Sequence, residues 1–249
     1  MAIGTGRTFI IASDVERDLS LNSIPQRSGY SSPLIKARRH RILAETQRLI
    51  GEVGAASLSM DVVASRADVA KRTLYNVFQS KERLLAAAIR QYFEDFASKV
   101  GHPAAPPTLD RMIERLLTMG IYGIAARNYV RALMDVYYAP DTDPDIRAAI
   151  CGVAIDTHGL WVRMTSSKDD LQPWVAVEDL IDHLVTLRMG VVNDWTLGRI
   201  TDQHFPVKLA RATLLLLAGS TRGASRKEVE QKLIELPDHP LLNKKARSG

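Results

Sequence analysis

The sequence predicts an all-α fold, with a short three-helix domain near the N-terminus and a larger helical domain after it. Three observations support this prediction. Apolar residues recur at intervals of three and four through most of the chain, which is the period of a helix. Proline, glycine and aspartate interrupt this pattern at short intervals. No segment alternates apolar and polar residues over a useful length, so no strand is expected.

Residues 1–32 mix glycine, serine, asparagine and proline without a sustained period, which predicts a partly disordered N-terminal extension. From Pro33 the pattern becomes helical. One apolar stripe on a basic helix is formed by Ile42, Leu43, Thr46, Leu49, Ile50 and Val53. Gly51 and Gly54 lie at the end of the stripe, where glycine favours a helix C-terminus.

Two short helices are predicted next. Ser59 is a suitable N-cap for the first of them. The residues expected to face inward from this helix are Val62, Val63 and Ala67. A break at Asp68 and Val69 separates it from the second helix, which spans residues 71–78. Leu74 and Phe78 are four residues apart in this helix and therefore share its inward face.

A fourth helix is predicted to begin after Ser80, which caps it, with Glu82 in its first turn, and to continue to about Val100. A proline-rich connection follows at residues 101–107. Five further helices are predicted at residues 108–126, 127–138, 143–166, 173–199 and 204–221. The expected domains are an extension (1–32), a helix-turn-helix domain (33–82), a larger domain (83–225) and a C-terminal tail (226–249).

The basic residues of the chain are concentrated in one segment. The net charge is +5, from 33 lysines and arginines against 28 acidic residues. Residues 33–90 carry 11 basic and 5 acidic side chains, whereas residues 91–249 carry 19 and 20. A basic patch confined to one module indicates a polyanionic partner, although a solvated helix face would give the same count.

Several function classes lack their characteristic patterns. Cys151 is the only cysteine and cannot form an internal disulfide. The longest apolar run near the C-terminus, residues 214–219, is too short to span a bilayer, and acidic and basic residues interrupt the N-terminal apolar run at 9–12. We expect a cytoplasmic protein without a membrane partner. The common catalytic and cofactor motifs are missing, so no enzyme activity, catalytic residue or cofactor is predicted.

One acidic pattern resembles a metal site only in part. Asp141, Asp143 and Asp145 alternate as in the start of a calcium loop. Such a loop requires glycine at its sixth position and glutamate at its twelfth, where this chain has Ile146 and Gly152. The pattern instead predicts a helix cap next to Pro144, and we expect no metal site.

The helix at residues 71–78 carries outward side chains that proteins use on DNA, namely Lys71, Arg72, Thr73, Tyr75 and Asn76. Lysine and arginine reach guanine acceptors or phosphates, and asparagine pairs with adenine. Tyrosine and threonine hydroxyls commonly hold phosphate oxygens. Ser59 and Lys81 lie at helix N-termini, where backbone N–H groups favour an anion. These residues predict contacts with double-stranded DNA.

The segment from Leu58 to Leu85 has a specific arrangement of side chains. A Leu-Tyr pair precedes a Phe three residues after the Tyr, and a Ser-Lys-Glu opens the next helix. The residues are Leu74, Tyr75, Phe78, Ser80, Lys81 and Glu82. Over about 45 residues this segment resembles the TetR family of one-component bacterial regulators.

Two positions depart from that family pattern. Asp68 stands where the family usually has glycine, but aspartate tolerates a left-handed backbone better than most residues, so the turn is expected to survive. Ala70 stands where the family often has serine or threonine. That change removes one helix cap and one possible phosphate contact.

The resemblance implies a homodimer in which the last two long helices, at about 174–200 and 204–221, form a four-helix bundle with the partner. The apolar residues of these helices are Leu180, Leu184, Leu187, Val191, Trp195, Leu209, Leu214, Leu216 and Leu217. The same residues would also fit the core of a single chain.

The resemblance further implies a small-molecule effector bound in the larger domain. The candidate pocket residues are Met112, Met119, Tyr122, Met134, Tyr137, Tyr138, His158, Trp161 and Met164. Methionine and aromatic side chains are common pocket walls, although they also fill ordinary cores. Few charged residues share this set, which favours an apolar or weakly polar effector.

The combined prediction is a ligand-responsive repressor that binds a palindromic operator as a homodimer. One alternative is an all-α small-molecule-binding protein or enzyme whose basic segment is incidental. Another is a membrane or protein-interaction module that uses the basic first helix, residues 36–48.

Overall fold

The fold is all-α, as predicted. The computed structural model describes residues 33–99 and 104–243, so the extension at 1–32 lies outside the described residues. Within the described ranges the chain forms helices and no β-strand. The elements are α1 (Pro33–Val53), α2 (Met60–Arg66), α3 (Lys71–Phe78), α4 (Lys81–Lys99), α5 (Leu109–Ala125), α6 (Arg127–Tyr138), α7 (Pro144–Ser167), α8 (Val177–Thr196), α9 (Phe205–Ser220), α10 (Gly223–Glu235), η1 (Leu236–Asp238) and α11 (Pro240–Asn243).

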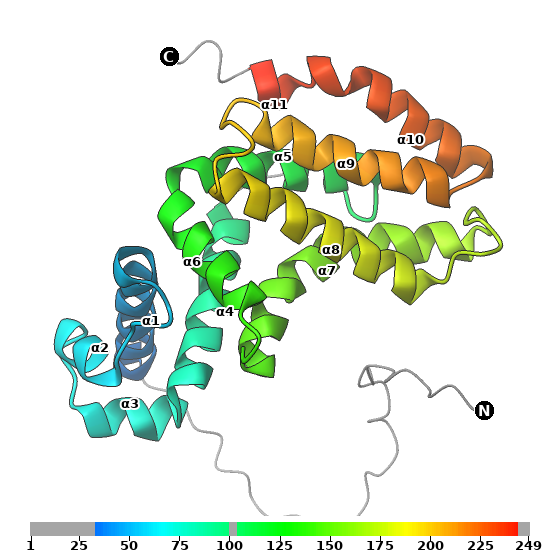
Figure 1. Ribbon diagram of the computed structural model, residues 1–249. Coiled ribbons are helices and arrows are strands. Elements are labelled where there is room, and N and C mark those ends of the chain that lie inside the picture. Colours follow the sequence, from blue (N-terminus) through cyan, green and yellow to red (C-terminus); the bar gives the residue numbers. More distant parts are fainter. Residues whose placement is uncertain (1–32, 100–103, 244–249) are drawn as a thin grey trace, which may run out of the picture.

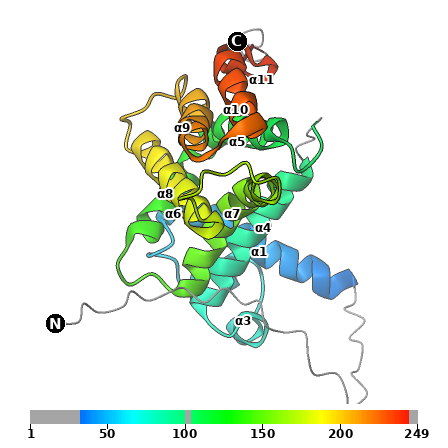
Figure 2. The ribbon, with the colours of Figure 1, turned by 90° about the vertical axis from the view of Figure 1, so that its right-hand side faces the viewer.

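The helices form a small domain and a larger body joined by one long helix. Helices α1, α2 and α3 lie together at one end of the molecule, and α4 runs from α3 into the larger body (Figure 1). Helices α8 and α9 lie side by side, and α10 packs on α9. Figure 2 shows α10 and α11 at the end of the molecule opposite α3.

Local capping signals explain where most helices begin and end. Gly54 has φ +81° and follows the last residue of α1, as its position in the sequence suggests. The Asp143 carboxylate accepts a hydrogen bond from the Asp145 backbone N–H, so the alternating aspartates cap α7. The Ser80 hydroxyl accepts from the Arg83 backbone N–H at 3.2 Å and caps α4.

Two segments near the C-terminus differ from the sequence prediction. Helix α8 begins at Val177 rather than at 173, because Leu171 forms a β-bridge with Thr221 and holds the preceding residues in a loop. The expected boundary at residue 225 falls inside α10. Val229 and Leu236 are fully buried, so the larger domain continues past the point where a tail was expected.

One apolar core runs through both domains. Buried residues of α1 to α4 pack in a single cluster with Tyr129 of α6, Ile150 of α7 and Val185 of α8. A second cluster lies between α5, α7, α8, α9 and α10 and includes Trp161 and Trp195. Val62 of α2, which was expected to face inward, is instead exposed. The first core cluster is therefore shared by the helices of the small domain and the larger body.

The apolar residues expected at a subunit interface divide into two groups. Seven of them are buried within the single chain: Leu180, Leu184, Val191, Trp195, Leu209, Leu214 and Leu217. Leu187 and Leu216 are partly exposed. The main apolar stripes of α8 and α9 therefore serve the core of the chain, because they face α5 and α7.

Candidate nucleic-acid interface and effector cavity

The turn between α2 and α3 is held by local backbone geometry and by one arginine. The Ser59 hydroxyl accepts a hydrogen bond from the Val62 backbone N–H at 3.2 Å and caps α2. Asp68 adopts φ +50°, the left-handed conformation that its place in the turn suggests. Arg41 of α1 donates from Nε to the Ala67 carbonyl at 2.9 Å and from Nη2 to the Asp68 carbonyl at 3.3 Å. The two Arg41 hydrogen bonds tie the turn between α2 and α3 to α1.

Helix α3 is anchored by two residues of its inward face. Leu74 and Phe78 are buried, and the Arg39 guanidinium lies 4.8 Å from the centre of the Phe78 ring. Ala70 precedes the helix without a side-chain cap, as the sequence indicates. The rest of α3 can therefore face outward without loss of packing.

The outward face of α3 brings together most of the predicted DNA-binding side chains. Arg72, Tyr75 and Asn76 are exposed, with 44% of Tyr75 accessible. Thr73 is half-buried. Lys71 is exposed but forms an ion pair with Asp61 of α2 at 2.8 Å, and this contact raises the pKa of Lys71.

Ser59 and Lys81 lie beside this face and hold the module together. The Lys81 ammonium donates to the Ala56 carbonyl at 2.9 Å, which joins the start of α4 to the α1–α2 connection. Ser59 is exposed in addition to capping α2. Both side chains thus have a structural partner, and Ser59 is exposed whereas Lys81 is half-buried.

The structure adds a second basic segment to the candidate interface. The first turns of α1, residues 33–41, are exposed along their whole length. They carry Lys36, Arg38, Arg39 and Arg41. Arg39 contacts Phe78 and Arg41 contacts the turn after α2. Sequence reasoning counted Lys36 and Arg38 in the basic segment at residues 33–90 but did not name them among the DNA-binding residues. Their charge alone was the available signal.

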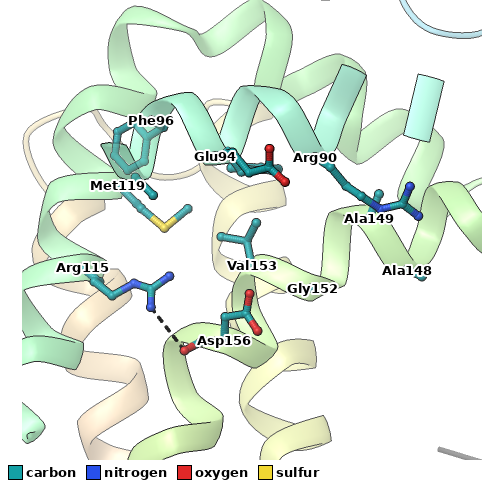
Figure 3. Close-up of a pocket in the computed structure, with 12 residues that line it drawn as sticks. Arg90, Glu94, Phe96, Arg115, Met119, Ala148, Ala149, Gly152, Val153 and Asp156 are labelled. Carbon is teal, nitrogen blue, oxygen red and sulfur yellow. Dashed lines mark hydrogen bonds between the residues drawn. The ribbon is translucent and has the colours of Figure 1, made fainter. Parts of the chain in front are cut away.

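The larger domain contains a cavity of about 310 Å³ between α4, α5 and α7 (Figure 3). Arg90 and Glu94 of α4, Arg115 of α5 and Asp156 of α7 line it. The Arg115 guanidinium donates to the Asp156 backbone carbonyl at 3.3 Å. Two basic and two acidic side chains therefore face this outer cavity, and their charges balance.

A smaller inner cavity of about 70 Å³ lies deeper in the domain. Phe93 of α4 and Met119 of α5 line both cavities and so stand between them. The remaining walls of the inner cavity are almost entirely apolar and include Leu133, Met134, Val192, Trp195 and Phe205. Arg188 of α8 is its only charged lining residue.

Arg188 is a buried cation without an acidic partner. It is 5% exposed, and no ion pair joins it to an aspartate or glutamate of the described residues. Its guanidinium donates to the Thr157 hydroxyl at 3.4 Å and to the Met119 sulfur at 3.0 Å. Burial, together with the charge of Arg115, lowers the pKa of Arg188 to about 10. An unpaired buried charge costs on the order of several kcal/mol.

His158 of α7 lies in the same electropositive region. It is fully buried, and its Nδ1 lies 3.4 Å from the Met112 sulfur, while its Nε2 has no partner. Burial lowers the pKa of His158 to about 3, and the charges of Arg188 and Arg115 act in the same direction. His158 is therefore neutral at physiological pH.

The predicted effector residues are only partly brought together. Met119 and Met134 line the inner cavity. Tyr122 and Tyr138 are exposed, Tyr137 and Met164 are half-buried, and Met112, His158 and Trp161 pack in the core. Phe93, Arg115 and Arg188 line the cavities and were missing from the predicted set.

The described part of the chain has neither a membrane-spanning helix nor a metal-binding cluster. No helix there is long and apolar enough to cross a membrane. No group of three or more histidine, cysteine, aspartate or glutamate residues is placed there to hold a metal ion.

Comparison with known proteins identifies the N-terminal module. Residues 42–88 match the family model described as bacterial regulatory proteins, tetR family. An 82-residue segment is 43% identical to the HTH-type transcriptional repressor KstR of Rhodococcus jostii and covers 33% of this chain and 39% of the relative. The chain thus matches about two fifths of the length of that curated relative.

Solved structures resemble a larger part of the chain. A TetR transcriptional regulator from Rhodococcus sp. RHA1 is 26% identical, with a TM-score of 0.52 over 73% of this chain and 96% of the other. A tetR-family regulator from Streptomyces coelicolor is 20% identical and shares the fold, with a TM-score of 0.55 over 85% of this chain and 96% of the other. The helix-turn-helix with its buried Leu74 and Phe78 agrees with these matches: residues 42–88 form an N-terminal module of the tetR family of bacterial regulatory proteins, and the helical body is similar in fold to solved TetR-family regulators.

Proposed function

We propose that this protein is a transcriptional repressor that places α3 in the major groove of DNA and responds to a small molecule bound in its larger domain. The exposed face of α3 carries the proposal. Arg72, Tyr75 and Asn76 project from a short helix that is anchored by two buried residues on its other side. Such a helix fits the major groove, and these side-chain types contact bases and phosphates. The family model that matches residues 42–88, and the similarity of an 82-residue segment to a transcriptional repressor, support this function.

The double variant Arg72→Ala/Tyr75→Ala tests the assignment of α3. Both side chains are exposed, so the variant is expected to fold as the wild type does. We expect at least a tenfold loss of affinity for a DNA site selected with the wild-type protein, because a base or phosphate contact contributes about 1–3 kcal/mol. The measurement is a fluorescence-anisotropy titration over a series of salt concentrations, in which wild-type affinity falls as salt rises.

A matched control removes the same residue types far from α3. Arg226 of α10 and Tyr138 of α6 are both exposed, and the variant Arg226→Ala/Tyr138→Ala has the same change in charge and aromatic content. It is expected to bind DNA as the wild type does. Equal affinity of the α3 double variant and the wild type would remove α3 from the DNA interface.

The outer faces of α8 and α9 are proposed to join two copies of the chain. Leu215 of α9 is 55% exposed, and Gly190 and Gly219 leave space beside the helices because nothing lies within 4 Å of a Cβ built on either. Small residues allow close approach of helices, and an exposed leucine adds apolar area to bury. A two-fold dimer presents two copies of α3 to DNA and requires an operator with inverted half-sites.

Helix α4 provides the route from the effector cavity to the DNA. Phe93 and Glu94 line the cavity near its C-terminal end, and Lys81 begins the helix directly after α3. The Gln47 side chain of α1 donates to the Ala88 carbonyl of α4 at 3.0 Å. A shift of α4 therefore carries α1 and α3 with it. An effector that binds one position of α4 more tightly changes the population of DNA-binding dimers.

A further inference from the structure

We propose that the effector is an amphipathic monoanion of the carboxylate class, whose anionic head binds Arg188 and whose hydrocarbon part lies against the apolar wall of the inner cavity. This inference rests on the proposed function only in calling the ligand an effector. The sequence favoured an apolar or weakly polar ligand because the predicted pocket set holds almost no charge. The structure adds Arg188 to the cavity wall and changes that expectation.

The two cavities differ in the charges of the side chains that line them. In the outer cavity Arg90 and Arg115 face Glu94 and Asp156, so no net charge remains there (Figure 3). In the inner cavity Arg188 is the only charged lining residue. One positive charge is therefore unbalanced, and a ligand with one negative charge would balance it.

The present partners of Arg188 are weak acceptors for a guanidinium. Its Nη2 donates to the thioether of Met119 at 3.0 Å, and its Nη1 donates to the Thr157 hydroxyl at a long distance, 3.4 Å. A carboxylate presents two oxygens to the planar guanidinium and forms much stronger charge-assisted bonds than a thioether does. Methionine is flexible, so the Met119 side chain can rotate away from Arg188. The ligand carboxylate can then take its position.

The position of Met119 also joins the two cavities into one site. It lines both of them, as Phe93 does, and these two side chains separate a volume of about 310 Å³ from one of about 70 Å³. Displacement of Met119 would open the outer cavity to Arg188. The apolar residues beside Arg188, among them Leu133, Met134 and Val192, would then contact a hydrocarbon chain.

A second buried group, His158, lies in the same positively charged region as Arg188. His158 Nε2 is buried without a partner, and the two positive charges that reach this imidazole are those of Arg188 and Arg115. A neutral imidazole carries no charge, so it does not offset the positive charge of either arginine. The region around Arg188 therefore holds positive charge, and no carboxylate of the described residues pairs with Arg188.

The test compares ligands that share a tail and differ in their head group. Hexanoate, decanoate and tetradecanoate are titrated into the full-length protein by calorimetry, each against the alcohol and the amine of the same length. We expect at least one carboxylate to bind at least tenfold more tightly than its alcohol and its amine. Equal binding of carboxylate and alcohol at every length, or no binding of any carboxylate, would overturn the proposal.

Variants of Arg188 locate the head group. Arg188→Met keeps an unbranched side chain and removes the charge, and loss of an unpaired buried charge is compatible with folding. We expect the preference for carboxylate over alcohol to disappear in Arg188→Met and to persist in part in Arg188→Lys. Arg199→Met is the control, because Arg199 is exposed and paired with Asp194 at 2.9 Å. A carboxylate preference that survives in Arg188→Met would overturn the assignment.

DNA binding by the same preparations separates this inference from the proposed function. If wild-type protein binds its selected DNA site and shows no carboxylate preference, the ligand class is wrong and the repressor function stands. If it prefers carboxylates but binds no DNA, the ligand class stands and the repressor function fails. If both hold, decanoate is expected to release wild-type protein from DNA and to leave the Arg188→Met complex in place.

Discussion

Arg188 occupies a place where the sequence pattern expects an apolar residue. Leu180, Leu184, Val191 and Trp195 of α8 are buried at helical spacing, and position 188 falls on the same stripe. Sequence reasoning placed Leu187 on that stripe instead, whereas Leu187 is partly exposed and Arg188 is buried. A charged residue inside a regular apolar stripe is the signal that would have found it.

His158 makes the stability of the fold depend on pH. Its pKa is about 3 in the folded chain, because of burial first and of Arg188 and Arg115 second, and its ordinary value is 6.5. As pH falls below 6.5 the unfolded chain takes up a proton that the folded chain does not, so the free energy of unfolding decreases. Between pH 7 and pH 5 we expect His158 to account for a decrease of about 1–2 kcal/mol.

Denaturant unfolding at both pH values measures this contribution. His158→Gln is expected to show a smaller decrease than the wild type between pH 7 and pH 5, whatever its stability at pH 7. His183→Gln is the control, because His183 is exposed on α8. If His158→Gln retained the full pH dependence of the wild type, the protonation of another group would be responsible.

Among the elements, the contact of α5 with α9 depends on one glycine. A Cβ built on Gly120 of α5 would lie 2.7 Å from Cα of Pro206 in α9, so the two backbones touch at this point. Gly120→Ala is therefore expected to lower the free energy of unfolding by about 1–3 kcal/mol, since the helices must separate. Gly152→Ala in α7 is the control, because nothing lies within 4 Å of its built Cβ. A neutral effect of Gly120→Ala would contradict the close packing.

Elements with local signals were predictable from the sequence, and elements that depend on distant contacts were not. The helix predicted at residues 127–138 agrees with α6, and Ser59, Ser80 and Asp143 cap α2, α4 and α7 as expected. Residues 173–176 were predicted as the start of a helix but lie in a loop, because Leu171 pairs with Thr221 some fifty residues away. Most of helix α10 was assigned to a tail, and only two of its residues, Ser225 and Val229, are buried, so its apolar pattern is weak.

The same distinction holds for the candidate site. The face of α3 follows from the spacing of Leu74 and Phe78 within one short helix, and Arg72, Tyr75 and Asn76 lie on it as predicted. The cavity wall combines residues of α4, α5, α7 and α8. Only the packing of these helices brings Phe93, Arg115 and Arg188 together. The cavity can therefore not be recognised from the positions of these residues in the sequence.

At the scale of the whole molecule, one apolar core joins the helix-turn-helix to the helices that line the proposed ligand cavity. The core cluster of the small domain includes Tyr129, Ile150 and Val185 of the larger domain. The Tyr92 and Tyr129 rings stand 4.4 Å apart at this junction, and burial raises the pKa of both. Packed cores shift between discrete arrangements rather than deforming continuously, so under the proposed function a bound ligand would change the spacing of the two α3 helices of the proposed dimer.

The central claim is that two copies of this chain place their α3 helices on DNA with two-fold symmetry. Selection of binding sites from random duplex DNA by the full-length protein, followed by sequencing, tests it most directly. We expect an enriched sequence made of two half-sites in inverted orientation, and no such enrichment with Arg72→Ala/Tyr75→Ala. A single half-site, a direct repeat, or no enrichment by the wild-type protein would contradict the account.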